Sequence, residues 1–427
     1  MRRLVGIYLT AEAVQRDPAY LDALQAGLGL NQVILSGPVR LSPATLALNP
    51  FASGDRAARL RELAARRLSG EPLIDEGEAR APLAGRFPPA DCADDDSPLR
   101  EAIALCRERG LAVWYLAHGW TYRRTMLCPS KPALDEGYRA AFAEIARSYP
   151  FDAVDVTHAR YPLFGFPEGL EVCVCDDCAV AAGELGYDLR RIAASLREIP
   201  ARLARWPAAT LAQLVDRSPG LPEVIELLGL PAAWLDWLYL RAELVARRIA
   251  QFRRAVHAAA GRPILFGSDT YPPALALLVG HRYATWPTHS DFTSPLLSHV
   301  EAFVTQGFAR WSQRLCQAMP GLGEATALSL LYRLTGYDGL GMPLEVSDFH
   351  LGERDCEFRR VPLQALMERD LAKARLFATR EIPCYPIIQG GVWPREVVRR
   401  LVEYAEEVGH EGIIFQGTDS LVDYQPK

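Results

Sequence analysis

Three cysteines lie within six positions of the segment EVCVCDDCAV, as Cys173, Cys175 and Cys178. Thiols at this density can serve three chemistries, namely a redox pair, a catalytic thiolate or a metal site. Cys175 and Cys178 have the C-x-x-C spacing of a redox pair. The extra thiol beside them and the adjoining acids, Asp176 and Asp177, nevertheless disfavour an activated thiolate. The spacing C-x-C-x2-C favours a metal site, because one tight loop then supplies three of the four ligands that zinc prefers.

Cys128, in the segment RRTMLCPSKP, is the predicted fourth ligand. It follows one predicted strand and the other three cysteines follow the next, so the two loops should be neighbours in a parallel sheet. Thiolates this close repel one another unless a cation offsets their charge. Four protein ligands leave no open coordination position, so the metal would be structural and would not catalyse a reaction. We therefore predict a structural zinc ion held by Cys128, Cys173, Cys175 and Cys178.

Three aspartates at predicted strand ends are candidates for carboxylate acid/base catalysis. Asp269 directly follows FGS at the end of an apolar run and is the best single candidate. Asp155 lies inside a predicted strand, where it could instead be a satisfied interior carboxylate paired with Arg160. Asp419 in QGTDS could instead cap a following helix, because aspartate is a favoured N-cap residue.

Hydrogen-bonding and aromatic side chains follow most of the predicted strands and form a candidate substrate-binding set. In parallel barrels the carboxyl ends of the strands carry the chemistry. Polar side chains bind hydroxyl groups and aromatic faces stack on the C–H surface of sugar rings, so the set suits a sugar or another polyol. Some members could instead serve the fold, as His158 would if it only oriented its loop. The predicted substrate-binding residues are His118, Thr157, His158, Arg160, Tyr271, His299, Gln389 and Gln416.

Eight short runs rich in β-branched or aromatic residues alternate with helical patterns along the chain. This alternation predicts a parallel sheet, and eight repeats favour a closed (β/α)8 TIM barrel of the α/β class over an open doubly wound sheet. No GxGxxG follows the first run, which argues against a dinucleotide-binding sheet. The predicted strands are residues 4–10, 32–37, 111–120, 152–162, 263–273, 290–299, 382–391 and 411–420.

Residues 1–427 are predicted to form a single TIM-barrel domain in which several connections are enlarged. The insertions fall at about 38–100, 185–250 and 300–380. Extra length between strands costs little loop entropy and usually lies on the functional face of a barrel. The aromatic helix at 233–240 could form an interface, which would make the protein a homo-oligomer.

The composition of the chain argues against several partners. A net charge of −5 gives no electrostatic reason to expect nucleic acid or an anionic membrane. No window has the about 18 consecutive apolar residues of a spanning helix, and the N-terminal apolar run is too short for a signal peptide. We therefore expect a cytoplasmic protein, in which thiols stay reduced. An odd number of cysteines, nine, also argues against a disulfide framework.

The cysteine pattern resembles the zinc site of the family 42 β-galactosidases. In that family a cysteine after strand three joins a C-x-C-x2-C after strand four. The matching residues here are Cys128 with Pro129, followed by Cys173, Cys175 and Cys178. More loosely, DAVDVTHARYP and LVGHRYATWPTHSDFTSPLLSH are similar to the strand-four and strand-six regions of other glycoside-hydrolase-like barrels. The resemblance covers roughly residues 1–35 and 110–420 and implies a carbohydrate-active barrel with a structural zinc.

The catalytic glutamates of family 42 do not carry over to this chain. That family has an Asn-Glu pair at the end of strand four and a glutamate after strand seven, where this chain has VTHAR and IIQGG. In the looser group of barrels, the strand-four aspartate aligns with Thr157. Hydrolysis by two facing carboxylates therefore needs other residues, and we predict Asp269 with Asp155 or Asp419.

Three functions remain open from the sequence. The first is a glycoside hydrolase or a relative acting on a glycan, with Asp269 as proton donor or base and His118, His158 and Gln389 orienting the sugar. The second is a catalytically degenerate barrel that binds carbohydrate, because the glutamates are missing. The third is another hydrolase or lyase that uses the histidines, including His299, with a second metal. No HxH or HExxH pattern supports that third function.

Overall fold

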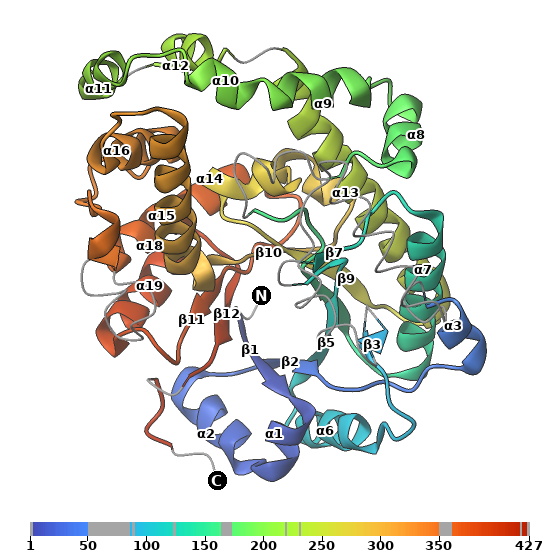
Figure 1. Cartoon of the computed structure of the whole chain (residues 1–427). Coiled ribbons are helices and arrows are strands. Elements are labelled where there is room, and N and C mark those ends of the chain that lie inside the picture. The colour runs from blue at the N-terminus through green and yellow to red at the C-terminus, as the bar shows by residue number, and fades with distance from the viewer. Residues whose placement is uncertain are drawn as a thin grey trace.

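Eight parallel strands form a nearly closed barrel in the computed structural model of the chain (Figure 1). The structure describes residues 3–49, 86–87, 90–122, 125–163, 173–217, 220–229, 232–349, 361–418 and 421–424. The strand order β10-β9-β8-β5-β2-β1-β12-β11 follows the chain around the ring, so each strand lies beside the next one in sequence. The strands are β1 (Leu4–Thr10), β2 (Gln32–Ser36), β5 (Ala112–His118), β8 (Ala153–Thr157), β9 (Leu265–Thr270), β10 (Thr293–Pro295), β11 (Ile387–Gln389) and β12 (Gly412–Gln416).

The ring closes between β10 and β11. Two isolated parallel bridges join these strands, Thr293 to Cys384 and Leu296 to Ile387. The N–H of Thr293 donates to the carbonyl of Pro383 at 3.0 Å, and the N–H of Tyr385 donates back to Thr293 at 2.9 Å. The predicted (β/α)8 fold is therefore confirmed, and each of the eight predicted strand segments contains one barrel strand.

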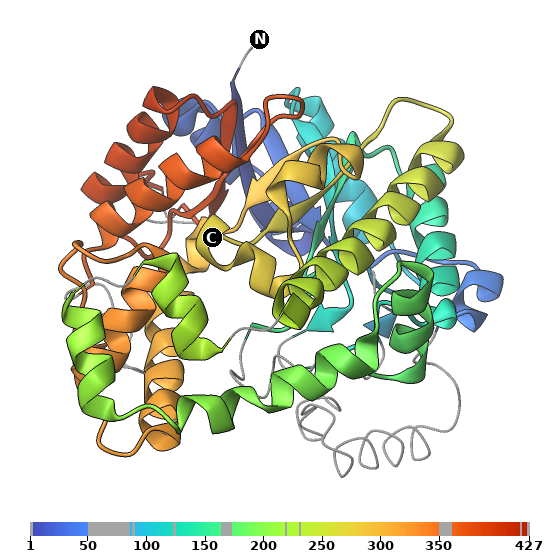
Figure 2. The same cartoon turned by 90° about the horizontal axis from the view of Figure 1, so that it is seen from above.

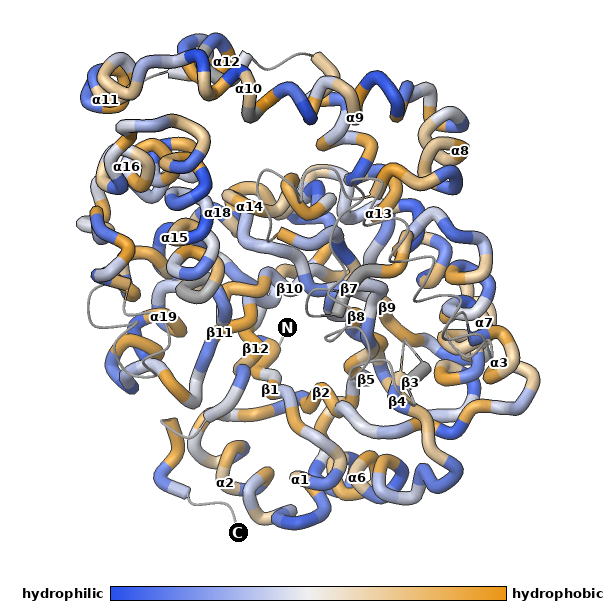
Figure 3. Tube along the Cα trace, in the orientation of Figure 1, coloured by the Kyte–Doolittle hydropathy of each residue, from blue (hydrophilic) through white to orange (hydrophobic). Residues whose placement is uncertain are grey.

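Helices surround the barrel and connect its strands (Figure 1). Figure 3 shows hydrophobic and hydrophilic stretches alternating along helices such as α6 and α7, which fits a helix that packs one face against the barrel. The helices in the ring are α1 (Ala11–Arg16), α2 (Ala19–Leu28), α3 (Pro43–Ala47), α6 (Ser97–Glu108), α7 (Pro132–Ser148), α13 (Ala232–Ala260), α14 (Pro273–Ala276), α15 (Val300–Ala318), α16 (Glu324–Thr335), α18 (Leu363–Phe377) and α19 (Arg395–Glu407). Two short hairpins join β3 (Arg86–Phe87) to β4 (Ala90–Asp91) and β6 (Thr121–Tyr122) to β7 (Thr125–Met126).

A row of short helices between β8 and α13 forms an arm along one side of the barrel (Figures 1 and 2). The arm consists of α8 (Asp176–Glu184), α9 (Leu189–Arg197), α10 (Ile199–Leu203), α11 (Ala208–Asp216) and α12 (Leu221–Leu228). It packs on α13 at one end and on α15 and α16 at the other. The predicted insertion at 185–250 thus spans most of this arm and the first part of α13. Within 233–240, Trp237 is buried and Leu235 is 55% exposed, and an interface there stays a prediction.

The barrel interior has a hydrophobic core of its own, separate from the core beneath the helices. It consists of Ile34, Trp114, Ala153, Phe292, Ile387 and Ile414. Because side chains alternate along a strand, the residues two and four positions from these also face the axis. Above Ala153 in β8 these are Asp155 and Thr157. Above Gly267, where a Cβ would touch the Phe292 ring, the next inward residue is Asp269. Among the described residues, no helix has the length and apolar character needed to cross a bilayer.

Candidate functional site

The four predicted zinc ligands come together at one point. The sulfurs of Cys128, Cys173, Cys175 and Cys178 all lie within 4.8 Å of one another, and no other group of potential metal ligands among the described residues is as close. The Cys128 sulfur is 3.2 Å from that of Cys178 and 3.5 Å from that of Cys175. A tetrahedral zinc with Zn–S bonds of about 2.3 Å separates its sulfurs by roughly 3.8 Å. The donor set and its spacing therefore fit zinc.

The start of α8 positions two of these thiols. Cys175 is the N-cap residue of the helix and Cys178 lies in its first turn. The neighbouring thiols of Cys128, Cys173 and Cys178 lower the pKa of Cys175. A helix N-terminus favours negative charge, so the local backbone also stabilises a thiolate. The cluster thus ties the loop after β5, through Cys128, to the connection after β8.

Asp155 and Asp269 lie on neighbouring strands inside the barrel. Asp155 is fully buried in β8 and Asp269 is 3% exposed near the end of β9. The hydroxyl of Tyr8 donates to Oδ2 of Asp155 at 2.8 Å, which is the partner observed in place of the predicted Arg160. The Thr157 hydroxyl donates to Oδ2 of Asp269 at 2.7 Å. Oδ1 of Asp155 has no hydrogen-bond partner among the described residues.

Burial raises the pKa of both carboxyls. The pKa of Asp155 rises to about 7 because the side chain is desolvated and the charge of Asp269 is near, although the Tyr8 hydrogen bond opposes the rise. The pKa of Asp269 rises to about 6 because of desolvation alone. Hydrogen bonds from Thr157 and from the N–H of His158 hold it lower than that of Asp155, as does the charge of Arg160. Burial therefore favours the protonated form of both neighbouring acids, and more strongly for Asp155 than for Asp269.

A tight turn after β8 carries His158 and fixes this hydrogen-bond network. His158 has a φ of 61°, the only positive φ among the described non-glycine residues. This conformation costs energy and persists only where the surroundings impose it. Gly119 lies directly against the turn, since a Cβ there would be 2.4 Å from the nitrogen of Ala159. The Thr121 N–H donates to the His158 carbonyl at 3.1 Å and so holds the turn from the other side.

Thr157 connects the His158 ring to the Asp269 carboxylate. Its hydroxyl is 2.8 Å from Nδ1 of His158 and 2.7 Å from Asp269. The single hydroxyl proton is used toward the carboxylate, so Nδ1 of His158 must carry a proton and donate to Thr157. Burial and the charge of Arg160 hold the pKa of His158 well below its usual range. The ring is therefore neutral, and Nε2 is its unprotonated nitrogen.

The remaining predicted binding residues surround this network. The His118 ring lies 6.1 Å from the His158 ring, and the Arg160 guanidinium lies 4.5 Å from the centre of the Tyr271 ring. Ser298 donates to the side-chain oxygen of Gln416 at 2.7 Å and contacts Nδ1 of His299 at 2.9 Å. Gln389 pairs with Gln416 in the register of β11 and β12. Asp419 lies outside the described residues.

Two polar residues of this site lie in predicted strand segments but were not included in the predicted substrate-binding set. Tyr8 lies on the inner face of β1 and bonds Asp155, and Ser298 links Gln416 with His299. Alternation along β1 places Tyr8 on the inner face, but it does not show which strand's carboxylate the hydroxyl reaches. The sequence does place a tyrosine near the end of a predicted strand, but it cannot identify the group to which that tyrosine bonds.

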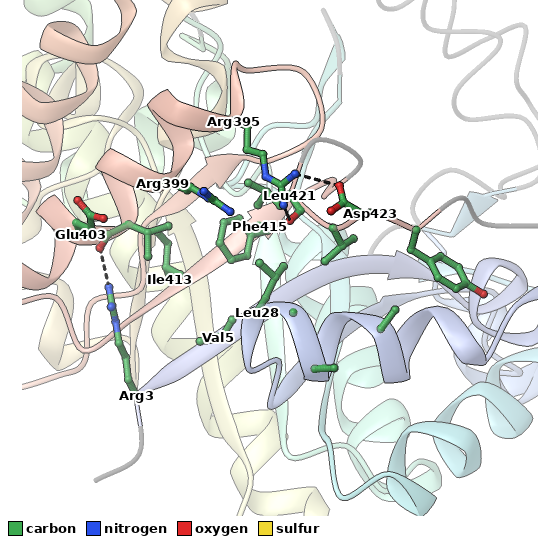
Figure 4. A pocket seen from close by; sticks show the side chains of 16 residues that line it. Arg3, Val5, Leu28, Arg395, Arg399, Glu403, Ile413, Phe415, Leu421 and Asp423 are labelled. Atoms are coloured by element: carbon green, nitrogen blue, oxygen red, sulfur yellow. Dashed lines mark hydrogen bonds and ion pairs between the residues drawn. The ribbon is translucent and has the colours of Figure 1, made fainter.

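A separate cavity of about 790 Å³ lies outside the barrel, between α2 and α19 (Figure 4). Its floor includes Val5, Ile413 and Phe415 from the outer faces of β1 and β12. Arg395 and Asp423 at its edge form an ion pair at 3.0 Å. None of the predicted site residues lines this cavity, so it is distinct from the carboxylate site.

Comparison with solved structures matches this chain to glycoside hydrolases at low sequence identity. The glycoside hydrolase domain of PgaB (BpsB) from Bordetella bronchiseptica matches 98% of this chain and 94% of its own length, at 11% identity and a TM-score of 0.48. A GH20 exo-β-N-acetylglucosaminidase from Vibrio harveyi, in complex with N-acetylglucosamine, matches 72% of this chain and 40% of its own, at 11% identity and a TM-score of 0.33. A GH18 chitinase from Chromobacterium violaceum matches 70% of this chain and 36% of its own, at 13% identity and a TM-score of 0.29. No protein-family model and no curated protein matches the sequence.

Proposed function

We propose that the protein is a glycoside hydrolase-like enzyme in which Asp269 and Asp155 perform acid/base chemistry on a glycan. The observation that carries this proposal is the pair of buried carboxyls on neighbouring strands, with pKa values raised to about 6 and about 7. Two acids whose pKa values are pushed apart can divide the roles of base and acid. Asp269, with the lower pKa, is the base, and Asp155 holds the proton.

Thr157 and His158 link the buried base to the mouth of the barrel. Asp269 itself is 3% exposed, whereas Thr157 and His158 are partly exposed. A proton taken up at Nε2 of His158 can be matched by transfer of the Nδ1 proton to Thr157 and of the threonine proton to Asp269. Each transfer follows a hydrogen bond of 2.7 or 2.8 Å. The carboxylate therefore acts at the mouth without contacting solvent itself.

Hydrogen-bonding groups at the carboxyl ends of the strands favour a polyol ligand. Oδ1 of Asp155 on β8 and the hydroxyl of Ser294 on β10 have no partners among the described residues, and both lie at inward positions of the barrel on either side of β9. Three further predicted residues, His118, Gln389 and Gln416, are partly exposed around them. Unpaired polar groups in an enclosed site are stabilised by a ligand that supplies the missing hydrogen bonds. A sugar, with a hydroxyl on most carbons, supplies such bonds in number.

We further propose that the cysteine cluster binds zinc in a structural role. Four thiols within 4.8 Å are the donor set of a closed tetrahedral site, and the pattern is similar to that of family 42. When bound, zinc would hold the loop after β5 against the start of α8. This proposal is independent of the catalytic one, because the cluster would leave no coordination position for a substrate.

The catalytic proposal is tested with a panel of aryl glycosides. We expect Asp269→Asn and Asp155→Asn to lower kcat by about 100-fold to 10,000-fold on any substrate that the wild type hydrolyses, because general acid/base catalysis is lost. Asp370→Asn is the matched control. Asp370 is also fully buried, and its pKa is also raised by burial to about 7, but it lies on α18 and bonds Tyr337. Its replacement should leave kcat within about twofold.

Two outcomes would contradict the proposal. Equal kcat losses in Asp269→Asn and in the Asp370→Asn control would show that the site carboxylates act only through stability. No turnover of any glycoside, with oligosaccharide binding retained, would identify the chain as a carbohydrate-binding barrel without catalysis.

A further inference from the structure

Helix α13 presents two buried arginines toward the cysteine cluster. Arg241 and Arg248 are 1% and 9% exposed, and their spacing of seven residues places them on the same face of the helix. Arg241 lies over the ring of Tyr161, at 4.6 Å from its centre, and donates to the carbonyl of Leu278 at 2.8 Å. Long cationic side chains are almost never fully buried unless a charge or acceptor nearby stabilises them.

Arg248 is tied directly to the loop that carries Cys128. Its Nε donates to the carbonyl of Pro129, the residue that follows this cysteine. Its Nη1 forms an ion pair with Asp135 at 2.7 Å, and Asp135 also pairs with Arg139 at 3.0 Å. The guanidinium is therefore held beside the metal-binding loop by polar contacts that do not involve a thiol.

The cluster cysteines act on the pKa values of both arginines in the same direction, since they favour the charged guanidinium. Burial lowers the pKa of Arg241 to about 10, and the thiols of Cys173 and Cys178 act in the opposite direction. Burial also lowers the pKa of Arg248, while Asp135 and, to a smaller extent, Cys128 raise it. Each arginine thus lies within electrostatic range of cluster sulfurs. Among the described residues, the charges near the cluster also include the acids Asp176 and Asp177 at the start of α8 and Lys131 in the loop after Cys128.

Four thiolates and one Zn²⁺ carry a net charge of about −2, which a low-dielectric surrounding makes costly. We propose that Arg241 and Arg248 supply the two positive charges that offset a zinc–tetrathiolate centre, and that the metal thereby fastens α13 to the loops after β5 and β8. This inference rests on the proposed zinc site. It makes α13 an outer layer of that site, so metal retention depends on a helix that contributes no ligand.

The inference is tested by zinc content and zinc release in the full-length protein. Zinc is first counted per chain in the purified wild type. Release to a chromogenic chelator is then timed for the wild type, Arg241→Met, Arg241→Lys and Arg248→Met. Arg247→Met is the matched control, since Arg247 lies on the same helix, is exposed and pairs with Glu184 at 2.8 Å.

We expect about one zinc per wild-type chain. The two methionine variants should release it about 10-fold to 100-fold faster, as is usual when a second layer of contacts is removed. Arg241→Lys keeps the charge and should stay within a few-fold of wild type, and Arg247→Met should match wild type. Near-ultraviolet circular dichroism of the loaded variants separates this effect from misfolding.

Each other result has a distinct meaning. A wild type without zinc would overturn the zinc site itself. A wild type with zinc, and methionine variants that release it at the wild-type rate, would overturn only the role of the arginines. Equal acceleration in Arg241→Lys and Arg241→Met would assign Arg241 to packing on Tyr161 and would likewise reject the charge-balancing role.

Discussion

At the residue scale, the properties of the candidate site come from the arrangement around Thr157. Its hydroxyl joins the Asp269 carboxylate to the His158 ring, and the strained turn at His158 aims a backbone N–H at the same carboxylate. The sequence predicted Asp155, Thr157, His158 and Asp269 as site residues, because polar types follow apolar runs at barrel strand ends. It could not predict which of these groups bond to one another, because the distances across a barrel depend on strand register and on turn conformation.

Removing the Thr157 hydroxyl should change the pH dependence of the proposed activity. Thr157→Val deletes a hydrogen bond that lowers the pKa of Asp269, so that pKa should rise by about one unit, the value of one hydrogen bond to a charged group. Because valine also interrupts the proposed proton path, kcat/KM should fall, and the acidic limb of the remaining activity should move to higher pH. Thr157→Ser keeps the hydroxyl and should keep the wild-type limb. An unchanged pH profile in Thr157→Val would show that the Thr157 hydroxyl does not affect the pKa of Asp269.

At the element scale, one close contact inside the barrel joins β9 to the residue that precedes β10. Gly267 lies under the ring of Phe292, which in turn packs at a tilt against Trp114, with 4.4 Å between ring centres. The sequence indicated both strands from their apolar runs. The need for glycine at this point was not visible there, because it depends on an aromatic ring that enters from a neighbouring strand.

Gly267→Ala should therefore destabilise the barrel. The added Cβ would lie 2.4 Å from the Phe292 ring, and overpacking of a core costs about 1–3 kcal/mol. The free energy of unfolding measured in urea should fall by that amount. Gly307→Ala in α15 is the control, because nothing lies within 4 Å of its Cβ position. It should raise the stability by about 0.5–1 kcal/mol, since alanine favours a helix. A stable Gly267→Ala variant would mean that the ring of Phe292 moves away freely.

At the scale of the whole molecule, the sequence predicted the barrel well and its surroundings less well. Strand positions follow from local periodicity, and closure follows from their number. The course of the helical arm could not be predicted, because it depends on contacts such as that between α11 and α16. These helices are far apart in the sequence, and hydrophobic periodicity shows which face of each is apolar but not which helix it packs against. The cysteine cluster was predictable, because side chains that could share one metal ion follow a recognisable spacing in the sequence.

The buried acids also make stability depend on pH across the whole molecule. Burial raises the folded-state pKa of Asp370 to about 7 from a usual value of 3.8, so the native state binds a proton that the unfolded chain has lost. That stabilisation is complete below about pH 4 and disappears as the pH rises through 7. Buried histidines such as His281, whose pKa is lowered to about 3, have the opposite slope below about pH 6.5. The contribution of one acid is therefore best isolated with a variant.

Between pH 5 and pH 8, wild-type protein should lose about 2–3 kcal/mol more unfolding free energy than Asp370→Asn, which has no proton to release. Urea denaturation at the two pH values measures this difference. The exposed Asp216→Asn serves as the control and should follow the wild type. Parallel pH dependence of wild type and Asp370→Asn would show that Asp370 stays ionised in the folded protein.

The closure between β10 and β11 determines where the ring can come apart. Each of these strands is three residues long, and two isolated bridges join them, whereas β1 pairs with β2 over five residues. Local opening starts where few backbone hydrogen bonds have to break. The cylinder therefore has a preferred line of separation along one side, while the strands that carry Asp155 and Asp269 lie within the better-paired part of the sheet. Opening along that line would leave the pairing of β8 with β9, and so the two carboxylates, in place, but it would separate Ser294 on β10 from Gln389 on β11, two groups of the proposed binding site.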